Sequence, residues 1–320
     1  MISCRIFILW ETTMKLYFAP LEGIAGCIYR NTHRAFFDGC DAYFAPFITP
    51  SEQERVSRKG LKDVLPEKNP GQNLKVQVLA NHKDAILPFA EKIKSYGYTE
   101  LNLNAGCPYP RVVNKGRGAG LLLEKEKLDR LLDEVFSQIN IQLSVKTRAG
   151  FYHTEELAEL MEIYNQYPIS LLTVHPRARE AFYSGEPDMT AFSQGYALSK
   201  NPICYNGNIL TKEDFEKIAH QFPALESVMI GRGAIKNPAI FREIKGGERL
   251  STRELQAFSE KLLENYYAEL KSEIFTLQKL KEVWNYMIQN YPEEKKIAKK
   301  IKKANKLVDL QEAISQLPSL

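Results

Sequence analysis

Short runs of apolar, β-prone residues alternate with longer stretches that carry apolar residues at helical spacing, up to about residue 231. We interpret the short runs as strands, and their nearly continuous apolar character predicts a parallel sheet buried on both faces. The predicted strands span residues 15–20, 42–47, 74–79, 100–104, 142–147, 170–175, 202–206 and 227–231. The predicted helices between them span residues 25–37, 83–95, 124–138, 154–166, 189–198 and 212–220, and a polar, charged loop is expected at 51–69.

Eight strands that lead into helices predict a closed (β/α)8 barrel, the TIM-barrel fold. An open doubly wound sheet is disfavoured because no GxGxxG motif follows the first strand. The strand pattern then stops, and three further helices are expected at residues 251–269, 275–290 and 293–317. We therefore predict an α/β chain, with a TIM barrel over residues 14–246 and a small C-terminal all-helical domain over residues 247–320. The boundary is expected near Gly246–Gly247.

Residues 1–13 form an N-terminal extension ahead of the first predicted strand. Its apolar run, Ile6–Trp10, is shorter than a signal-peptide core or a membrane span. Two explanations stay open: translation starts at Met14, or the extension is ordered and packs on the barrel. No other run approaches the roughly 20 apolar residues of a membrane helix, so no membrane association is expected.

Composition indicates an ordinary globular protein. The 43 basic and 39 acidic residues give a net charge of only +4, which is too balanced to indicate a partner. The five cysteines are odd in number and none forms a CxxC pair, so neither a disulfide framework nor a metal site is expected. A reduced, cytoplasmic setting is predicted.

The distribution of charge is more informative than its sum. Lysines crowd the last predicted helix, and such a cluster suits the binding of nucleic-acid phosphates, although a solvated helix face is the alternative. These lysines are Lys295, Lys296, Lys299, Lys300, Lys302, Lys303 and Lys306.

Reactive residues gather at the carboxyl ends of the predicted strands, where barrel active sites form. Cys107 follows the fourth strand in the motif NAGCP, Lys146 lies at the end of the fifth, and His175 and Arg177 follow the sixth. A lone cysteine is more often a small buried hydrophobe, but a polar, Gly- and Pro-rich loop favours reactivity. A lysine in a barrel mouth is costly to bury alone, so Lys146 predicts an anionic ligand.

Two glycine-containing motifs end the seventh and eighth strands. They are Asn206–Gly207–Asn208 and Gly231–Arg232–Gly233. In barrels the loops after these two strands often bind a phosphate group. Glycines allow close backbone approach and Arg232 can pair bidentately with phosphate, so a phosphate-bearing cofactor is predicted, although the glycines could instead serve only tight turns.

An ordered set of motifs resembles the bacterial-type, FMN-dependent tRNA-dihydrouridine synthases from about Leu16 to Phe241. The most specific is the GCP segment with its trailing glycine-rich loop, whereas NGN and GRG are shared with many flavin barrels. The motifs are APLEGI, VQV, LNLNAGCPYPRVVNKGRGAGLL, VKTRAG, VHPRAREAFYSGEPD, YNGNI and MIGRGAIKNPAIF. The chain departs from the family pattern at Leu21, where Met is usual, at Gly26, where Asp is frequent, and at Asn208, where a carboxylate is common.

The resemblance implies an FMN enzyme that reduces the C5–C6 double bond of a uridine in tRNA, with NADPH or NADH as the electron donor. Hydride would reach C6 from the reduced FMN, and Cys107 would protonate C5. The resemblance assigns flavin contacts to Pro20, Leu21, Glu22, Gln77, Lys146, His175, Asn206, Gly207, Asn208, Gly231 and Arg232. It assigns substrate contacts to Asn104, His175 and Arg177, and the lysine cluster adds Lys295, Lys296, Lys299 and Lys300 as tRNA contacts.

Two other functions fit parts of the sequence. One is an FMN-dependent dehydrogenase of a free pyrimidine, of the dihydroorotate type, which leaves the basic helical tail unexplained. The other is a non-catalytic tRNA-binding module, which leaves Cys107, Lys146 and His175 unexplained. No protein partner is implied, and the sequence determines neither the tRNA position nor the oligomeric state.

Overall fold

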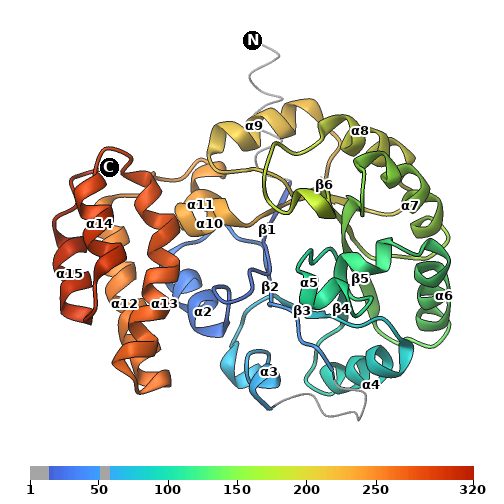
Figure 1. The fold of residues 1–320 in the computed structure, drawn as a ribbon, viewed down its shortest axis with the longest axis horizontal. Helices are drawn as coiled ribbons and strands as arrows, with labels where there is room; N and C mark the ends of the chain where they lie inside the picture. Colours follow the sequence, from blue (N-terminus) through green and yellow to red (C-terminus); the bar gives the residue numbers. More distant parts are fainter. Residues whose placement is uncertain (1–13, 51–57) are drawn as a thin grey trace. The chain divides into compact units, whose positions relative to one another are not determined.

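The computed structural model describes residues 14–50 and 58–320, so the predicted extension 1–13 lies outside the described residues. Within the described part, the strands form a closed parallel barrel in sequence order, which confirms the predicted TIM-barrel class (Figure 1). The strands are β1 (Lys15–Phe18), β2 (Ala42–Phe44), β3 (Leu74–Val78), β4 (Glu100–Ala105), β5 (Gln142–Gly150), β6 (Leu172–Ala178), β7 (Ile203–Tyr205) and β8 (Ser227–Ile230).

Most strand residues are buried on both faces, as the continuous apolar runs predict. Every residue of β4, β6 and β8 is buried. Helices cover the outer faces of the strands, as Figure 1 shows for α6 (Lys125–Phe136), α7 (Leu157–Tyr164) and α8 (Met189–Leu198), and each of these three helices buries apolar side chains. Such two-sided burial is the usual environment of parallel strands.

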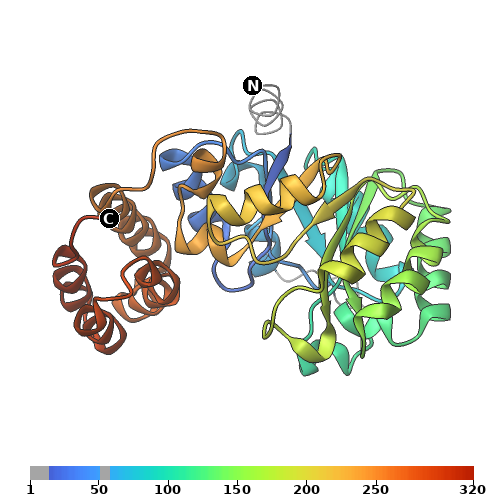
Figure 2. The same ribbon diagram turned by 90° about the horizontal axis from the view of Figure 1, so that it is seen from above.

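The helices alternate with the strands and then continue alone towards the C-terminus. Those of the barrel region are α2 (Cys27–Phe36), α3 (Arg58–Lys62), α4 (Lys83–Lys94), α5 (Pro110–Val113), α6 (Lys125–Phe136), α7 (Leu157–Tyr164), α8 (Met189–Leu198), α9 (Lys212–Gln221), α10 (Arg232–Lys236) and α11 (Ile240–Ile244). The C-terminal ones are α12 (Thr252–Leu270), α13 (Glu273–Met287), α14 (Lys295–Lys303) and α15 (Leu307–Ser315), gathered into one bundle in Figure 2. Short 3₁₀ segments are η1 (Pro66–Lys68), η2 (Gly118–Leu122), η3 (Thr154–Glu156), η4 (Arg179–Ala181) and η5 (Ile288–Asn290). None of the described helices is both long and apolar enough to cross a membrane.

The structure corrects three of the predicted elements. The expected loop at 51–69 contains α3 and η1 among its described residues. Strand β6 extends to Ala178, beyond the predicted end at residue 175, so Arg177 as well as His175 lies within the strand. The strand continues because pairing with β5 persists past a bulge, with Ala178 opposite Gly150.

The third correction concerns the last predicted helix, 293–317, which is two helices. Helix α14 ends at Lys303. The next residue, Ala304, has an extended backbone (φ −53°, ψ 130°), and its carbonyl accepts a hydrogen bond from Lys281 Nζ (2.9 Å). Helix α15 then begins with a new cap, because Asp309 accepts a hydrogen bond from the backbone N–H of Lys306 (3.2 Å). The break was not predicted because neither Gly nor Pro marks it and the apolar spacing continues through it.

The described chain divides into two compact units. The first contains the described part of residues 1–41 together with residues 209–223 and 230–320, and the second contains residues 42–208 and 224–229. The boundary predicted at Gly246–Gly247 falls inside the first unit, between α11 and α12, and stays a prediction.

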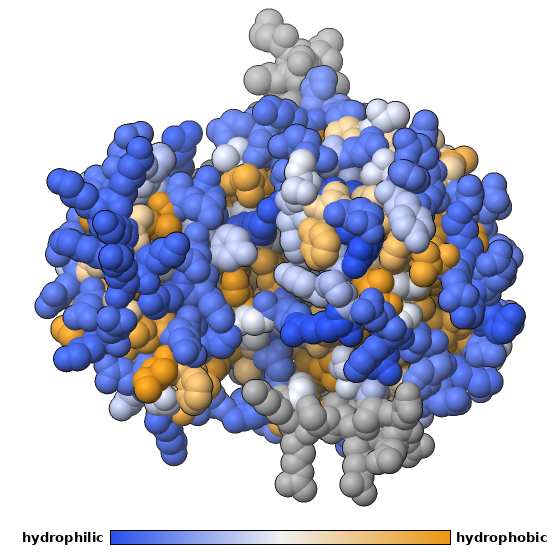
Figure 3. Space-filling view, in the orientation of Figure 1, coloured by the Kyte–Doolittle hydropathy of each residue, from blue (hydrophilic) through white to orange (hydrophobic). Residues whose placement is uncertain are grey.

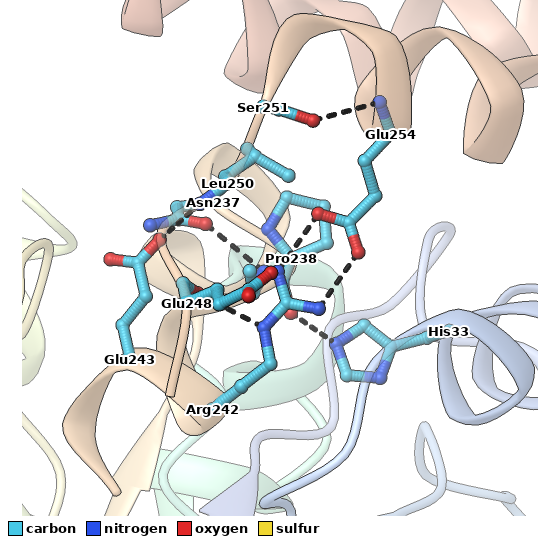
Figure 4. A network of polar contacts seen from close by, with 10 residues as sticks. His33, Asn237, Pro238, Arg242, Glu243, Glu248, Leu250, Ser251 and Glu254 are labelled. Carbon is cyan, nitrogen blue, oxygen red and sulfur yellow. Dashed lines mark hydrogen bonds and ion pairs between the residues drawn. The ribbon is translucent and has the colours of Figure 1, made fainter. Parts of the chain in front are cut away.

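A polar network fixes the connection between α11 and α12 within the first unit (Figure 4). Arg242 forms two 2.8 Å hydrogen bonds with the carboxylate of Glu254, and its Nε donates to the carbonyl of Glu248 (3.0 Å). Glu243 accepts from the backbone N–H of Leu250 (2.8 Å). Because Arg242 bonds to both the connection and α12, the first turn of the C-terminal bundle is attached to α11.

Candidate active site

Cys107 lies directly after β4, in a small apolar cluster of the second unit. Its thiol side chain is buried and packs with Leu79 and Val112, and the partly buried Phe47 joins them. The residue belongs to the loop between β4 and α5, whose backbone N–H groups at Gly106 and Cys107 both donate to Asn104 Oδ1 (3.0 and 2.9 Å). The cysteine is therefore fixed in place by its backbone.

The glycines that follow Cys107 fold the loop tightly against it. Gly118 has φ +57°, and a Cβ there would come within 2.9 Å of Cys107 Cβ and Val112 Cγ1. The carbonyl of Cys107 accepts a hydrogen bond from the N–H of Ala119 (3.0 Å). The glycine-rich loop is therefore tightly folded against Cys107.

Lys146 lies on β5 beside the end of β4, with its Cα paired opposite Asn104. Burial and, to a smaller extent, the charge of Arg148 lower the pKa of its ammonium group, whereas Cys204 and Cys107 raise it; together these effects bring the pKa to about 8. A partly buried ammonium group whose pKa is lowered in this way gains from an anionic ligand. The predicted anionic ligand of Lys146 stays a prediction.

Arg148 is a further charged residue near the end of β5, and the sequence assigned it no role. It is almost fully buried, and it joins the loop after β4 to the end of β6 by donating to the carbonyls of Gly106 (2.9 Å) and Ala178 (3.0 Å). Burial lowers the pKa of its guanidinium group to about 10. A signal was present in the sequence, because residues two apart on a strand point to the same side and Arg148 follows Lys146 by two.

His175 and Arg177 lie on β6 and contact each other, with 2.7 Å between Arg177 Nη1 and His175 Nε2. An arginine can only donate, so Nε2 accepts and the proton of the neutral ring is on Nδ1. Arg177 is buried and also donates to the carbonyls of Ser184 (3.2 Å) and Gly185 (2.7 Å). In this structure Arg177 orients His175 and holds the following loop; its predicted contact with a base stays a prediction.

Tyr183 is a second residue that the sequence pattern did not reveal. Its ring lies nearly parallel to that of His175 (6.1 Å between centroids, 28°), and the guanidinium of Arg148 lies 5.4 Å from its centroid. The side chain is 46% exposed, so part of the ring is open to solvent beside His175. The preceding residue, Phe182, has φ +48°, so the backbone is strained where this loop turns.

Asn104 and Gln77 form part of one hydrogen-bonded group. Asn104 Nδ2 donates to Gln77 Oε1 (2.9 Å), and Gln77 Nε2 donates to Asn102 Oδ1 (2.6 Å). Gln77 is fully buried, and both polar atoms of its amide bond to asparagines. The predicted contact of Gln77 with a flavin ring therefore stays a prediction.

The NGN motif after β7 is held by neighbouring side chains of the second unit. Asn206 Nδ2 donates to the carbonyl of Met229 (2.7 Å), and Asn208 accepts from Arg177 (3.1 Å) and donates to Glu186 (3.1 Å). Gly207 is required for packing, because a Cβ there would overlap the hydroxyl of Tyr205. The arrangement rigidifies the motif, and its predicted role in phosphate binding is untested.

The predicted cofactor residues of the first unit lie after β1 and β8. Pro20 and Leu21 are half-buried and Glu22 is exposed. Gly231 precedes α10, which begins at Arg232, and a Cβ at Gly231 would make only ordinary contacts, 3.4 Å from Ala19 and 3.6 Å from Leu21. Protein packing therefore does not require glycine at position 231, which suits a position where a ligand approaches the backbone.

The lysines of α14 lie on one side of the helix. Ile297 and Ile301 are buried on the other side, and Lys300 Nζ donates to the side chain of Gln316 (2.7 Å). Figure 3 shows hydrophilic side chains over α14. In the part of the chain that the structure describes, no carboxylate forms an ion pair with a lysine of α14. The exposed lysines of this segment are Lys295, Lys296, Lys299, Lys300, Lys302, Lys303 and Lys306.

Comparison with known proteins adds a family match over nearly the whole chain. The profile of the family described as dihydrouridine synthase (Dus) matches residues 17–318. The tRNA-dihydrouridine synthase B of Pseudomonas aeruginosa is 27% identical over 264 residues, which cover 80% of this chain and 77% of that protein. The tRNA-dihydrouridine synthase B of Pasteurella multocida is 25% identical over 234 residues, covering 73% and 69%. Among solved structures, histamine dehydrogenase from Rhizobium sp. 4-9 has a similar fold (TM-score 0.57, 9% identity), over 78% of this chain and 49% of that one.

Proposed function

We propose, from the premise that the chain belongs to the dihydrouridine synthase family, that it is an oxidoreductase that reduces the C5–C6 double bond of a uridine in tRNA. Its cofactor is FMN and its electron donor is NADPH or NADH. The observation that carries this proposal is the fixed Cys107 on a loop whose neighbouring strands supply Lys146, Arg148 and His175. The curated relatives named above support the choice of tRNA as substrate.

The residues present are compatible with a flavin. Lys146 is a partly buried cation suited to an anionic ring, and charge near the flavin ring tunes its electronics. Gly231 leaves the backbone after β8 accessible, and Arg232 supplies a cation suited to a phosphate. When bound, the flavin supplies the hydride that the reduction requires. The other proposed flavin contacts are Pro20, Leu21, Glu22, Gln77, His175, Asn206, Gly207 and Asn208.

The protein's own contribution is to stabilise charge and to deliver a proton. Addition of hydride at C6 places negative charge on C5 and the adjacent carbonyl oxygen of the uracil. Cationic and N–H donors in a site from which water is largely excluded stabilise such charge, and Lys146, Arg177 and the Nδ1–H of His175 are suitable. Cys107 then donates its thiol proton to C5, a step of general acid catalysis that is typically worth about 10²–10⁴-fold.

The substrate base has to leave its stack to reach such a site. Flipping a nucleotide costs a few kcal/mol, and backbone contacts elsewhere on the tRNA must offset that cost. We assign those contacts to the exposed lysines of α14, including Lys295, Lys296, Lys299 and Lys300. Their charges are not paired with carboxylates of the described residues, so they are available for phosphates.

Oxidation of NADPH by the flavin-loaded protein tests this function against its competitors. Unmodified tRNA is expected to stimulate oxidation, whereas free uridine and orotate are not. Equal stimulation by a free pyrimidine would favour the dehydrogenase of the dihydroorotate type. Purified protein that holds no flavin even after incubation with FMN, yet binds tRNA, would favour the non-catalytic binding module.

A further inference from the structure

A series of buried, hydrogen-bonded polar side chains begins at Glu100, the first residue of β4, in the second unit. Glu100 on β4 forms an ion pair with Lys75 (2.8 Å) and accepts a hydrogen bond from the hydroxyl of Ser144 (2.6 Å). Ser144 in turn accepts from Asn102 Nδ2 (2.9 Å). Glu100 is 8% exposed, and Ser144 and Asn102 are fully buried. None of these three residues belongs to the predicted site.

The same series continues along the strands to the Cys107 loop, which follows the carboxyl end of β4. Asn102 Oδ1 accepts from Gln77 Nε2 (2.6 Å), and Gln77 Oε1 accepts from Asn104 Nδ2 (2.9 Å). Asn104 Oδ1 accepts from the backbone N–H groups of Gly106 and Cys107 (3.0 and 2.9 Å). An unbroken series of hydrogen bonds therefore connects Glu100 to the backbone of the proposed proton donor.

The direction of every bond in this series is fixed by its two ends. The carboxylate of Glu100 can only accept, whereas the backbone N–H groups of Gly106 and Cys107 can only donate. Between them, the hydroxyl of Ser144 and the three side-chain amides must all donate toward Glu100. A reversed amide would leave a buried donor facing a donor, and an unsatisfied buried polar group costs about 1–3 kcal/mol.

This fixed direction determines what Asn104 offers to a ligand. Its Oδ1 is used by the loop, and one hydrogen on Nδ2 bonds to Gln77, so the second Nδ2 hydrogen is the polar group that it can present. A donor is complementary to a carbonyl oxygen. Uracil carries a carbonyl at position 4, where cytosine carries an amino group that could not accept this hydrogen bond.

We propose that Glu100 is a positioning residue for the reduction: acting through Ser144, Asn102 and Gln77, it holds the Asn104 amide so that it donates to a pyrimidine carbonyl and secures the Cys107 loop. The catalytic part of this inference rests on the proposed function, whereas its structural part does not. Glu100 and Ser144 do not contact the reacting atoms, and their effect reaches the site through the amide series.

The first test measures amide hydrogen exchange at Gly106 and Cys107 in the full-length protein. Ser144→Ala removes the acceptor of Asn102, so exchange of both amides is expected to become about fivefold faster, as for the removal of a hydrogen bond worth ~1 kcal/mol. Ser227→Ala is the matched control, because Ser227 is a buried barrel serine outside the series. The amide of Ala191, which donates to Asp188 Oδ1 (2.9 Å), is the internal reference and should not change. Unchanged exchange at Gly106 and Cys107 in Ser144→Ala would overturn the proposal.

The second test reverses and then restores the series. In Asn102→Asp, carboxylates at positions 100 and 102 both face the hydroxyl of Ser144, which can donate to only one of them. The series is then interrupted, so exchange of the Gly106 and Cys107 amides should accelerate. Adding Glu100→Gln supplies an amide donor to Ser144, whose hydroxyl can then donate to the new carboxylate at position 102. The double variant should regain slow exchange, and failure to regain it contradicts the proposed series. If Asn102→Asp does not fold, Ser144→Ala carries the test, because it adds no charge.

Activity measurements distinguish the catalytic part of the proposal from its structural part. In flavin-loaded Ser144→Ala, kcat on unmodified tRNA should fall with little change in KM, because orientation acts in the reacting complex. A rise in KM alone, with kcat unchanged, would contradict the positioning role. If the exchange results hold but the wild-type protein does not reduce tRNA, the proposed function fails while the structural inference stands.

Discussion

At the residue scale, the sequence locates most of the candidate site because a barrel brings the ends of its strands together. Cys107, Lys146 and His175 could be selected by their positions at strand ends alone. Arg148 also lies near a strand end, on the same side as Lys146, but its role, like that of Tyr183, depends on contacts made only in the folded chain: Arg148 with the Gly106 and Ala178 carbonyls, and Tyr183 with the His175 ring. Hydrogen-bond partners of this kind leave no periodic signal in a sequence.

The thiol of Cys107 is expected to be dispensable for folding and essential for turnover. Cys107→Ala should retain FMN and the thermal stability of the wild type to within a few degrees, while turnover on unmodified tRNA falls by about 10²-fold or more, the usual worth of a general acid. Cys40→Ala, at a partly exposed cysteine outside the predicted site, is the control and should keep full turnover. Equal turnover in the Cys107 and Cys40 variants would refute the role.

The charge of Lys146 is expected to destabilise the folded protein when no flavin is bound. The folded-state pKa of about 8 lies below the ordinary 10.5. The free-energy cost of the charged lysine is therefore fully present below pH 8 and disappears as the pH rises towards 10.5. Lys146→Met should therefore raise the Tm of the flavin-free protein at pH 7 by about 2–4 °C, the shift expected for ~1 kcal/mol. The gain should shrink at pH 10, and the variant should bind FMN more weakly. A variant less stable than wild type at pH 7 would contradict this account.

At the element scale, the predicted strands and helices are nearly all present, and their ends differ by a few residues. The larger differences have local causes. Strand β6 extends past the apolar run because pairing with β5 continues to Ala178, and α14 ends where Lys281 binds the Ala304 carbonyl. Both causes are contacts between segments far apart in sequence, so neither was visible in the hydrophobic pattern.

Helix α14 is expected to provide tRNA affinity through its lysines. Reversing Lys295, Lys296 and Lys299 to glutamate should weaken binding of unmodified tRNA and reduce the slope of log K against log salt by roughly 1 for each phosphate that the helix no longer binds. Lys94→Glu together with Lys217→Glu is the control, because both lysines are exposed on other helices. Fluorescence anisotropy across a salt series measures the slope, and an unchanged slope would remove α14 from the interface.

At the scale of the whole molecule, counting strands was sufficient to predict the barrel, and the end of the strand pattern was sufficient to predict the helical C-terminal region. The network that ties α11 to α12 was not predictable. It depends on two-point pairing between Arg242 and Glu254, and both residues resemble ordinary surface charges in the sequence.

Arg242→Lys should loosen the attachment of the helical bundle. A lysine cannot form the paired hydrogen bonds to Glu254 and cannot also reach the Glu248 carbonyl, so a decrease of about 1–2 kcal/mol in unfolding free energy is expected. Denaturant unfolding measures it. Arg249→Lys, an exposed substitution in the same connection, should have no effect. Equal stability of the two variants would contradict the role assigned to the network.

The central claim is that this chain reduces a uridine in tRNA. The most direct measurement is nucleoside mass spectrometry of unmodified tRNA after incubation with the purified protein, FMN and NADPH. We predict that one uridine gains two hydrogens and is recovered as dihydrouridine, and that Cys107→Ala gives little or none. Unreduced uridine throughout the tRNA, with flavin bound and NADPH present, would contradict the account.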